Sequence, residues 1–362
     1  MSLSMEILAT DGEARRGRIT TGRGVVETPV FMPVGTRGAV VHLDARDYGP
    51  MGAEIVLGNT YHLMLRPGAE EIASLGGLHG FTGWSGHFLT DSGGFQVMSL
   101  KPRIDEAGAT FKSIYDGREV SLTPEEATRI QEQLGADFAM VLDICPSLPS
   151  PVHEVMEATE RTHRWAERAR AVHTRADQTQ FGIVQGGIDP GLRTHSARVL
   201  AGMDFGGYGI GGLSVGETRE EMMPALRAAL AELPADRPRY LMGVGDPLSI
   251  VQAVAAGVDM FDCVLPTRLA RHGTVLTWGG RLNLRNAVHR GDPSPLDARV
   301  GASADYSRAY LRHLLMVKEP SAGRILTLHN LAFLFDLVAT ARQAIEAGEL
   351  HSLTEEIAAH WS

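Results

Sequence analysis

The chain has 362 residues, of which 44% are hydrophobic and 21% charged, and its formal net charge is −9. This composition is ordinary for a soluble globular protein, and no apolar run approaches the length needed to span a bilayer. The acidic balance argues against a protein that coats nucleic acid over its whole surface, although it leaves room for a local basic patch.

Residues 5–41 predict a set of short antiparallel strands that precede the main domain, here called the antiparallel preamble. Three short strand patterns, residues 6–10, 18–21 and 28–34, are separated by glycine turns. We expect this segment to plug or flank the main domain, and a helix or turn over residues 43–52 to follow it.

Seven short apolar runs come next, and most end in a polar residue or a glycine pair. They are residues 54–59, 87–91, 138–143, 181–185, 208–213, 240–245 and 258–262. Continuous apolar runs of this length are typical of parallel strands that are buried on both faces. Because segments with helical periodicity separate most of the runs, we predict an α/β fold, a (β/α)8 TIM barrel with N-terminal antiparallel strands.

Several connections have recognisable boundaries. Thr123 followed by proline predicts a helix over residues 124–134, and Asp189 and Asp246 are expected to open later helices. Residues 100–120 predict an inserted hairpin with a type I′ turn at residues 116–117.

A long amphipathic helix is predicted over residues 151–175. It carries or adjoins His153, His163 and His173. We expect these histidines at the surface, because no carboxylate or cysteine spacing around them indicates a metal site.

Beyond residue 282 the barrel pattern gives way to a polar, proline-rich stretch. Helices are predicted over residues 306–317 and 323–347, the last of which would complete the outer ring of the barrel. We therefore expect one domain over residues 5–362, in which residues 283–330 form a C-terminal helical subdomain.

The candidate catalytic and binding residues lie at the ends of the predicted strands. In (β/α)8 barrels the active site forms at the C-terminal ends of the strands, so these residues would face one mouth. They are Asn59, Asp91, Gln96, Asp143, Gln185, Gly212, Met242 and Asp262. A lone aspartate there is more often a turn or cap residue, but three carboxylates, an amide and glycine backbone together predict a pocket for a flat heterocycle such as a purine.

Two carboxylates beside a glycosidic bond suit a double displacement, in which one attacks the anomeric carbon and the other manages the protons of the leaving group. We expect the nucleophile to be kept ionised by Arg268 or by backbone donors. Basic residues follow the last predicted strand closely, and they form either a solvated face or a surface for nucleic acid. They are Arg268, Arg271, His272, Arg281, Arg285, His289 and Arg290.

Five segments resemble the signature segments of the tRNA-guanine transglycosylases: residues 91–100, 181–187, 211–217, 240–245 and 261–268. The resemblance runs in order from about residue 5 to the C-terminal helices. It implies a (β/α)8 barrel and a homodimer. It also implies an enzyme that exchanges guanine at the wobble position of tRNA with a GUN anticodon for a 7-deazaguanine, a step toward queuosine.

Carried over by position, Asp262 resembles the nucleophile that forms a covalent tRNA intermediate. Asp91 resembles the acid/base that protonates the departing guanine and deprotonates the incoming base. The resemblance matches Asp143, Gln185 and the Gly212 backbone with the groups that read the polar edges of the base.

The Leu213 carbonyl matches the reader of the 7-substituent of the base. Phe95 and Met242 match the side chains that sandwich the ring, and Arg268 and Arg271 would hold the neighbouring nucleotides when the base leaves its stack.

The sequence departs from the family pattern at two places. Related enzymes bind a structural zinc ion through three cysteines and a histidine, but residues 295–305 contain no cysteine and only His329 of the ligand set remains. One histidine cannot make a tetrahedral zinc site, so we predict no zinc and no other cofactor. Ile144 replaces a glutamate of the bacterial pattern, whereas Val215 is typical of the bacterial type that uses 7-aminomethyl-7-deazaguanine.

These departures keep alternatives open. A queuine-salvaging or different-base transglycosylase would be consistent with Ile144, and a non-catalytic tRNA-binding subunit would be consistent with the missing cysteines. A generic sugar hydrolase would not explain Gln185 and the glycines. Because the two cysteines are too few for a disulfide framework and no signal-peptide pattern is visible, we expect a cytoplasmic protein without membrane contact.

Overall fold

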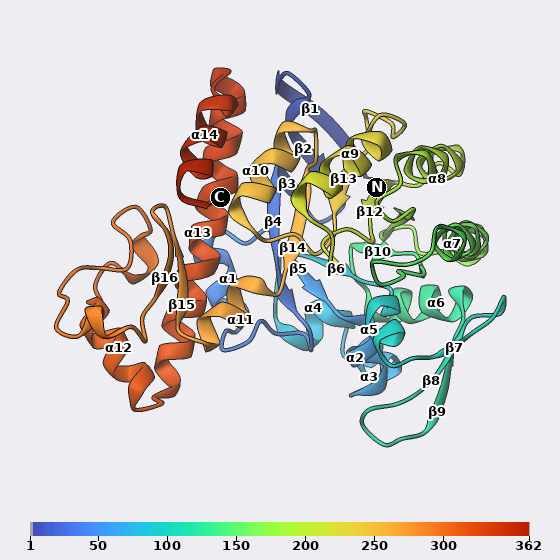
Figure 1. Ribbon diagram of the computed structural model, residues 1–362. Coiled ribbons are helices and arrows are strands. Elements are labelled where there is room, and N and C mark those ends of the chain that lie inside the picture. The colour runs from blue at the N-terminus through green and yellow to red at the C-terminus, as the bar shows by residue number, and fades with distance from the viewer. Residues whose placement is uncertain (1–2, 362) are drawn as a thin grey trace.

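The computed structural model describes residues 3–361 and has a closed barrel of parallel strands at its centre (Figure 1). The eight strands are β4 (Val30–Gly35), β5 (Ile55–Gly58), β6 (His87–Thr90), β10 (Phe138–Met140), β11 (Thr179–Val184), β12 (Gly207–Ile210), β13 (Arg239–Leu241) and β14 (Met260–Cys263). They are neighbours in this order, and β14 pairs with β4 to close the ring. The predicted (β/α)8 barrel is confirmed.

The sequence pattern predicts seven of the eight barrel strands and misplaces β4. The prediction that residues 28–34 belong to the antiparallel preamble is wrong, because β4 pairs in parallel with both β5 and β14. All six residues of β4 are buried, as a strand inside a ring of helices requires. The proline and glycine that border this run are equally typical of a hairpin, and its partner β14 lies far away in the sequence.

The antiparallel preamble itself is confirmed for β1 (Ser4–Asp11), β2 (Ala14–Thr20) and β3 (Val25–Thr28). This small sheet lies across one end of the barrel, at the top of Figure 1. Arg15, which is almost fully buried, donates to Asp259 at 2.9 Å just before β14 begins. The sheet therefore covers the end at which the barrel strands start.

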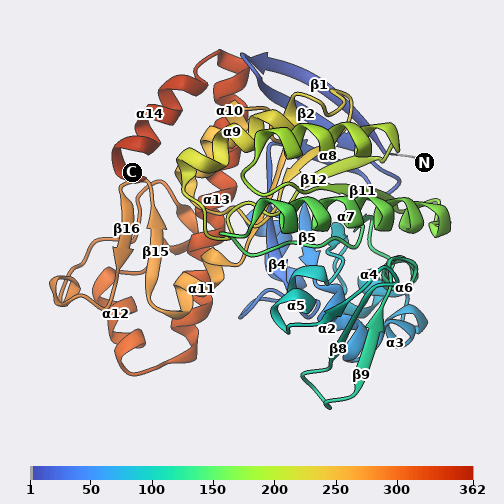
Figure 2. The same cartoon turned by 45° about the vertical axis from the view of Figure 1, so that its right-hand side comes forward.

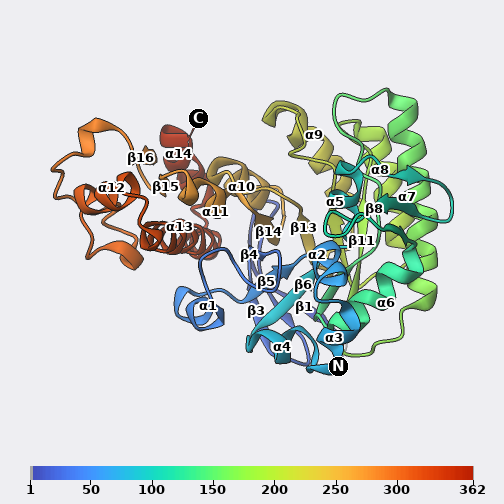
Figure 3. The ribbon, with the colours of Figure 1, turned by 90° about the horizontal axis from the view of Figure 1, so that it is seen from below.

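The described residues form fourteen α-helices, and most of them surround the barrel (Figures 2 and 3). They are α1 (Ala45–Met51), α2 (Thr60–Leu65), α3 (Ala69–Ser74), α4 (Gly77–Thr82), α5 (Gly94–Ser99), α6 (Pro124–Leu134), α7 (Val152–Val172), α8 (Pro190–Gly202), α9 (Arg219–Leu230), α10 (Pro247–Ala255), α11 (Leu265–Arg271), α12 (Arg308–Met316), α13 (Pro320–Ala347) and α14 (Leu350–Trp361). The predicted caps Thr123, Asp189 and Asp246 each accept a hydrogen bond from a backbone N–H of the first turn.

The histidines of α7 differ in their environment. His153 is exposed, but the expectation that His163 lies at the surface is wrong, because only 4% of it is exposed. His163 faces α8 and lies 2.9 Å from the Ser196 hydroxyl. A polar partner on a neighbouring helix is what allows a histidine to be buried in a helix whose other face is charged.

The insertion after α5 is a three-stranded sheet of β7 (Arg103–Ile104), β8 (Ala109–Lys112) and β9 (Glu119–Leu122). The predicted type I′ turn at residues 116–117 is wrong, because the loop spans residues 113–118. Ser113 N donates to Arg118 O at 2.9 Å and closes this longer loop, and Gly117 has a φ of 73°. The glycine is thus used for a left-handed position inside a six-residue connection.

The segment after α11 projects from the barrel, at the left of Figures 1 and 2. It contains the hairpin β15 (Thr274–Thr277) and β16 (Gly280–Asn283), the short 3-10 helices η1 (Ala287–His289) and η2 (Gly301–Ser303), and α12. It has a small hydrophobic core of its own, which includes Leu284, Leu296, Leu311 and Leu326. Its polypeptide returns to the barrel through α13.

Two features of the C-terminal helices differ from the predictions. The predicted last helix, α13, is followed by α14, which packs against α10. By length and composition α13 is apolar enough to cross a membrane, contrary to the expectation that no run approaches this length. However, 61% of its apolar window is buried within the protein, which is typical of a core helix.

Candidate active site

The strand ends bring the predicted site residues to one end of the barrel. Asp91, Asp143, Gln185 and Gly212 follow β6, β10, β11 and β12 respectively, and Asp262 lies within β14. The carboxyl ends of the parallel strands meet at the mouth opposite the N-terminal sheet. The structure therefore gathers residues that are far apart in the sequence at a single mouth.

Asp262 is held by two hydrogen-bond donors. The Tyr240 hydroxyl and the Gly243 backbone N–H donate to its Oδ1 at 2.6 Å and 2.7 Å. Burial raises the pKa of Asp262, and the two donors oppose this rise because they favour the ionised carboxylate. Within residues 3–361, Oδ2 accepts no hydrogen bond, so this oxygen is available for attack on a substrate.

The expected stabilisation of Asp262 by a backbone donor is therefore found, whereas the expected role of Arg268 is not. Arg268 is exposed on α11 and forms no ion pair with Asp262 in the described part of the chain. Arg271 is exposed on the same helix. The two arginines are free to contact a polyanion beside the mouth.

Asp91 accepts three hydrogen bonds. Thr60 N and Gly93 N donate to Oδ1 at 3.0 Å and 2.9 Å, and Asn59 Nδ2 donates to Oδ2 at 2.6 Å. Burial nevertheless raises the pKa of Asp91 to about 7, and the negative charge of Asp262 adds to this rise. A carboxyl group that titrates near neutral pH can both give and take a proton.

Asp143 and Gln185 form a pair on adjacent strand ends. Gln185 Nε2 donates to Asp143 Oδ2 at 2.7 Å, and burial raises the pKa of Asp143 to about 6. Gln185 Oε1 is buried without a partner among the described residues, and so is Gln96 Oε1 on α5. Unpaired buried oxygens are costly, and a ligand that donates hydrogen bonds would satisfy them.

The Gly212 backbone lies directly against this pair. Gly212 has a φ of 65°, and a Cβ atom there would lie 2.3 Å from Gln185 Oε1. Any other residue would therefore collide with the glutamine. Leu213, the next residue, is buried.

The two apolar platforms come from opposite walls of the barrel. Phe95 lies in the first turn of α5, after β6, and is 61% exposed; Met242 is half-buried after β13. In the order of the ring, β6 and β13 are four strands apart, which is the greatest separation in a barrel of eight. This arrangement suits a flat ring that enters between them.

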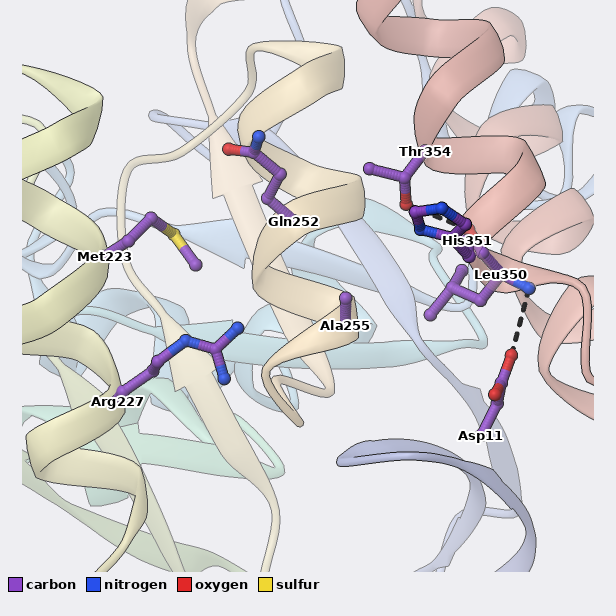
Figure 4. A pocket seen from close by; sticks show the side chains of 8 residues that line it. All are labelled: Asp11, Met223, Arg227, Gln252, Ala255, Leu350, His351 and Thr354. Atoms are coloured by element: carbon purple, nitrogen blue, oxygen red, sulfur yellow. Dashed lines mark hydrogen bonds between the residues drawn. The ribbon is translucent and has the colours of Figure 1, made fainter.

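An open groove elsewhere on the surface, with a volume of about 420 Å³, contains none of these residues (Figure 4). Met223, Arg227, Gln252 and Thr354 are among its lining residues, which come mainly from α9, α10 and α14. Because it lies away from the strand ends that carry Asp91 and Asp262, it is not part of the candidate site.

Comparison with known proteins agrees with this geometry. The sequence profile described as queuine tRNA-ribosyltransferase matches residues 11–362. The chain belongs to the queuine tRNA-ribosyltransferase family. The resemblance inferred from the motifs is thereby confirmed.

Similar family members come from several bacteria. The queuine tRNA-ribosyltransferase of Rhizobium meliloti is 49% identical over 99% of this chain and 97% of its own length. That of Brucella melitensis is 49% identical over 100% of this chain and 97% of its own length. That of Thermus thermophilus is 50% identical over 98% of this chain and 93% of its own length.

The zinc site that the family resemblance implies does not fit the residues of this member. His329 is fully buried on α13; its Nδ1 lies 2.7 Å from Ser303 Oγ, and its Nε2 lies 2.9 Å from Leu276 O. Burial lowers the pKa of His329 to about 4, so the ring is neutral and both nitrogens are engaged by protein groups. Neither Cys145 nor Cys263 belongs to this subdomain.

The roles of two site residues could not be predicted from the sequence. The sequence pattern places Tyr240 in a strand, but its hydroxyl donates a hydrogen bond to Asp262, the proposed nucleophile. Arg193, which is fully buried on α8, donates to the carbonyls of Gly211 at 2.7 Å and Gly212 at 3.2 Å, and so fixes the loop that faces the base-binding pair. Tyr240 lies in a segment that resembles a family signature, but the segment does not show what its hydroxyl contacts, and nothing in the sequence marks Arg193.

Proposed function

We propose that this protein replaces guanine at the wobble position of a tRNA anticodon by a 7-deazaguanine in queuosine biosynthesis. The observation that carries the proposal is the pair of carboxylates, Asp91 and Asp262, held in different hydrogen-bond environments at one mouth. The relatives named queuine tRNA-ribosyltransferase support the same activity. The enzyme is thus a pentosyltransferase.

The two carboxylates have different roles in the reaction. An oxygen of Asp262 attacks C1′ of the ribose, the C1′–N9 bond breaks, and its electron pair leaves with guanine, which Asp91 protonates. The incoming base then gives its N9 proton to Asp91, and N9 attacks C1′ and displaces Asp262. The exchange needs no oxidant or reductant, and it conserves the number of glycosidic bonds.

The surrounding residues would select the base and hold the tRNA. We assign the polar edges of the base to Asp143, Gln185 and the Gly212 backbone, and the 7-substituent to the Leu213 carbonyl. The unpaired oxygen of Gln185 and its bond to Asp143 support this assignment. Val215, as in the bacterial type, favours 7-aminomethyl-7-deazaguanine as the substrate.

Phe95 and Met242 would sandwich the ring, since they lie on opposite walls of the barrel. We assign the nucleotides beside the wobble position to Arg268 and Arg271, which are exposed at the mouth. We propose a tRNA with a GUN anticodon as the partner, as the family resemblance implies, and its target base would leave its stack to enter the site.

The test of this function is incorporation of labelled guanine into unmodified tRNA with a GUN anticodon, followed by a chase. We expect the tRNA to take up the label and 7-aminomethyl-7-deazaguanine to displace it. Displacement by queuine alone would reassign the chain to base salvage. A folded protein that binds tRNA but takes up no guanine would contradict the catalytic proposal.

One observation favours a second candidate, a transglycosylase with another base preference. Ile144 is 6% exposed beside Asp143, and its N–H donates to Thr162 Oγ1 at 3.0 Å. An apolar side chain there supplies no carboxylate to orient the Leu213 peptide. Competition among guanine, 7-aminomethyl-7-deazaguanine and queuine at equal concentration separates this candidate from the first.

We also propose that the C-terminal subdomain, residues 283–330, needs no zinc to fold. The hydrogen bonds of His329 to Ser303 and Leu276 and the small leucine-rich core support this proposal. A chelator should leave the hydrogen–deuterium exchange of residues 283–330 unchanged. Ser303→Ala, in contrast, leaves a buried ring nitrogen unpaired and should cost about 1–3 kcal/mol of unfolding free energy.

The control is Ser147→Ala, because Ser147 lies in an exposed loop and donates no hydrogen bond through its side chain in residues 3–361. It should leave the unfolding temperature within error of the original. Stoichiometric zinc that is lost on replacement of His329 would contradict the zinc-free subdomain.

We further propose a cytoplasmic homodimer. Large apolar side chains are exposed on the subdomain, which supports an interface there: Val288, Tyr306, Tyr310, Met316 and Val317. Light scattering of the purified protein should give twice the mass of the 39.0 kDa chain, and a monomer at all concentrations would exclude this assembly.

A further inference from the structure

A cluster of metal-ligating side chains lies on the outside of the barrel, away from the mouth. Glu160 and His163 lie almost one turn apart on α7, and His195 lies on the adjacent α8. One ligand atom from each residue lies within 4.8 Å of the other two. The sequence spacing along α7 could not reveal this cluster, because its third member comes from another helix.

The distances within the cluster suit a tetrahedral ion. His195 Nε2 lies 2.7 Å from Glu160 Oε1, and His163 Nδ1 lies 3.6 Å from Glu160 Oε2. Tetrahedral Zn²⁺ with bonds of about 2.0–2.1 Å separates its ligand atoms by roughly 3.4 Å. The two separations involve different oxygens of Glu160 and lie on either side of this value, so a small rotation of the carboxylate would present one oxygen to an ion that both imidazoles bind.

His163 provides an independent indication of a ligand. It is 4% exposed, and its Nδ1 has no hydrogen-bond partner among the described residues, although it is directed toward Glu160. Its other nitrogen, Nε2, lies 2.9 Å from Ser196 Oγ. When Nε2–H donates to this hydroxyl, Nδ1 carries a free lone pair, which is the state that a metal-binding histidine needs.

The charges around the cluster leave its carboxylate available. The nearby cations Arg161 and Arg164 both pair with Glu106. Within residues 3–361, the ion pairs of Glu160 are those with His163 and His195 alone. A carboxylate between two imidazoles, without an arginine or lysine partner, retains its negative charge for a cation.

We propose that Glu160, His163 and His195 bind one divalent first-row transition-metal ion, with Zn²⁺ as the best match and water as the fourth ligand. Imidazole nitrogen selects such ions over Mg²⁺ and Ca²⁺, which require oxygen ligands. Three protein ligands and one open position are typical of His- and Glu-ligated zinc.

The site is connected to the base-binding residues. Ser196 Oγ, which contacts His163, also accepts a hydrogen bond from the Gln185 backbone N–H at 3.2 Å. An ion on His163 would fix the orientation of this ring and strengthen its bond to Ser196. The metal would thus stabilise the end of β11 from the side on which α7 and α8 pack.

The test is calorimetric titration of the full chain with Zn²⁺ after a chelator has been applied and removed. We expect one ion per chain, the visible bands of a tetrahedral site when Co²⁺ is used instead, and no competition from Mg²⁺. His195→Ala and Glu160→Gln should each weaken Zn²⁺ binding by at least about tenfold. Both residues are partly exposed, so neither replacement threatens the core.

Matched control variants test whether Zn²⁺ binds at this cluster. His351→Ala removes an exposed histidine that also pairs with a glutamate on a helix, and it should leave Zn²⁺ binding unchanged. His329→Gln should do the same. The proposal is overturned if the wild type binds no stoichiometric Zn²⁺, if His195→Ala and Glu160→Gln bind it as the wild type does, or if Mg²⁺ competes.

Discussion

Asp262→Asn is expected to reduce guanine exchange by on the order of 10⁴-fold or more, because it removes the attacking oxyanion. The introduced amide keeps an oxygen that can accept from the Tyr240 hydroxyl and the Gly243 N–H, so the local structure should persist. The measurement is uptake of labelled guanine into tRNA, together with trapping of the covalent protein–tRNA adduct on a denaturing gel. Both signals should disappear together.

Two further variants make this test specific. Asp236→Asn changes an exposed aspartate far from the mouth and should exchange guanine at the original rate. Tyr240→Phe removes one of the two donors to Asp262 and leaves the other, so it should slow exchange less than Asp262→Asn does. An adduct that still forms in Asp262→Asn would show that another residue is the nucleophile.

Asp91 is expected to make the protein lose stability as the pH rises toward 7. Its folded pKa of about 7 lies above the ordinary aspartate value of 3.8, so between these values the folded state keeps a proton that the unfolded state has released. The associated stability is complete below about pH 4 and is lost as the pH rises through 7, by on the order of a few kcal/mol. Urea unfolding of the wild type from pH 5 to pH 8 measures this slope.

Asp91→Asn should reduce that slope, because the amide does not titrate, and the slope that remains comes from other buried carboxyl groups such as Asp143, whose pKa burial raises to about 6. It should also slow exchange by on the order of 10²–10⁴-fold, since the departing guanine loses its proton donor. Asp236→Asn again serves as the control and should keep the full slope. An unchanged slope in Asp91→Asn would mean that Asp91 is ionised throughout this range, and would remove the physical basis for its acid/base role.

The sequence predicted the parts of the site that lie at strand ends. Asp91, Asp143, Gln185 and Asp262 could be placed at one mouth because parallel strands in a closed barrel have only one carboxyl end. The helix caps could be predicted as well, because the signal and its effect lie within four residues. The helix caps follow from local patterns alone, and the strand ends follow from local patterns together with the parallel arrangement of the barrel strands.

The remaining features depend on contacts between distant segments. Arg193 looks like an ordinary helix residue, and its role follows only from carbonyls that another strand end supplies. His163 and His195 lie close together only because α7 and α8 pack against each other. The sequence pattern places β4 in the wrong sheet, because an apolar run does not show which strand it pairs with.

The closure of the barrel by β4 and β14 also has a consequence for synthesis on the ribosome. Val30 pairs with Met260, so one edge of β4 has no partner until nearly three quarters of the chain has been made. At about 5–20 residues per second, this interval lasts on the order of tens of seconds. During that time the edge is open to wrong pairing, so the nascent chain is expected to need protection by a chaperone before the last barrel strand emerges.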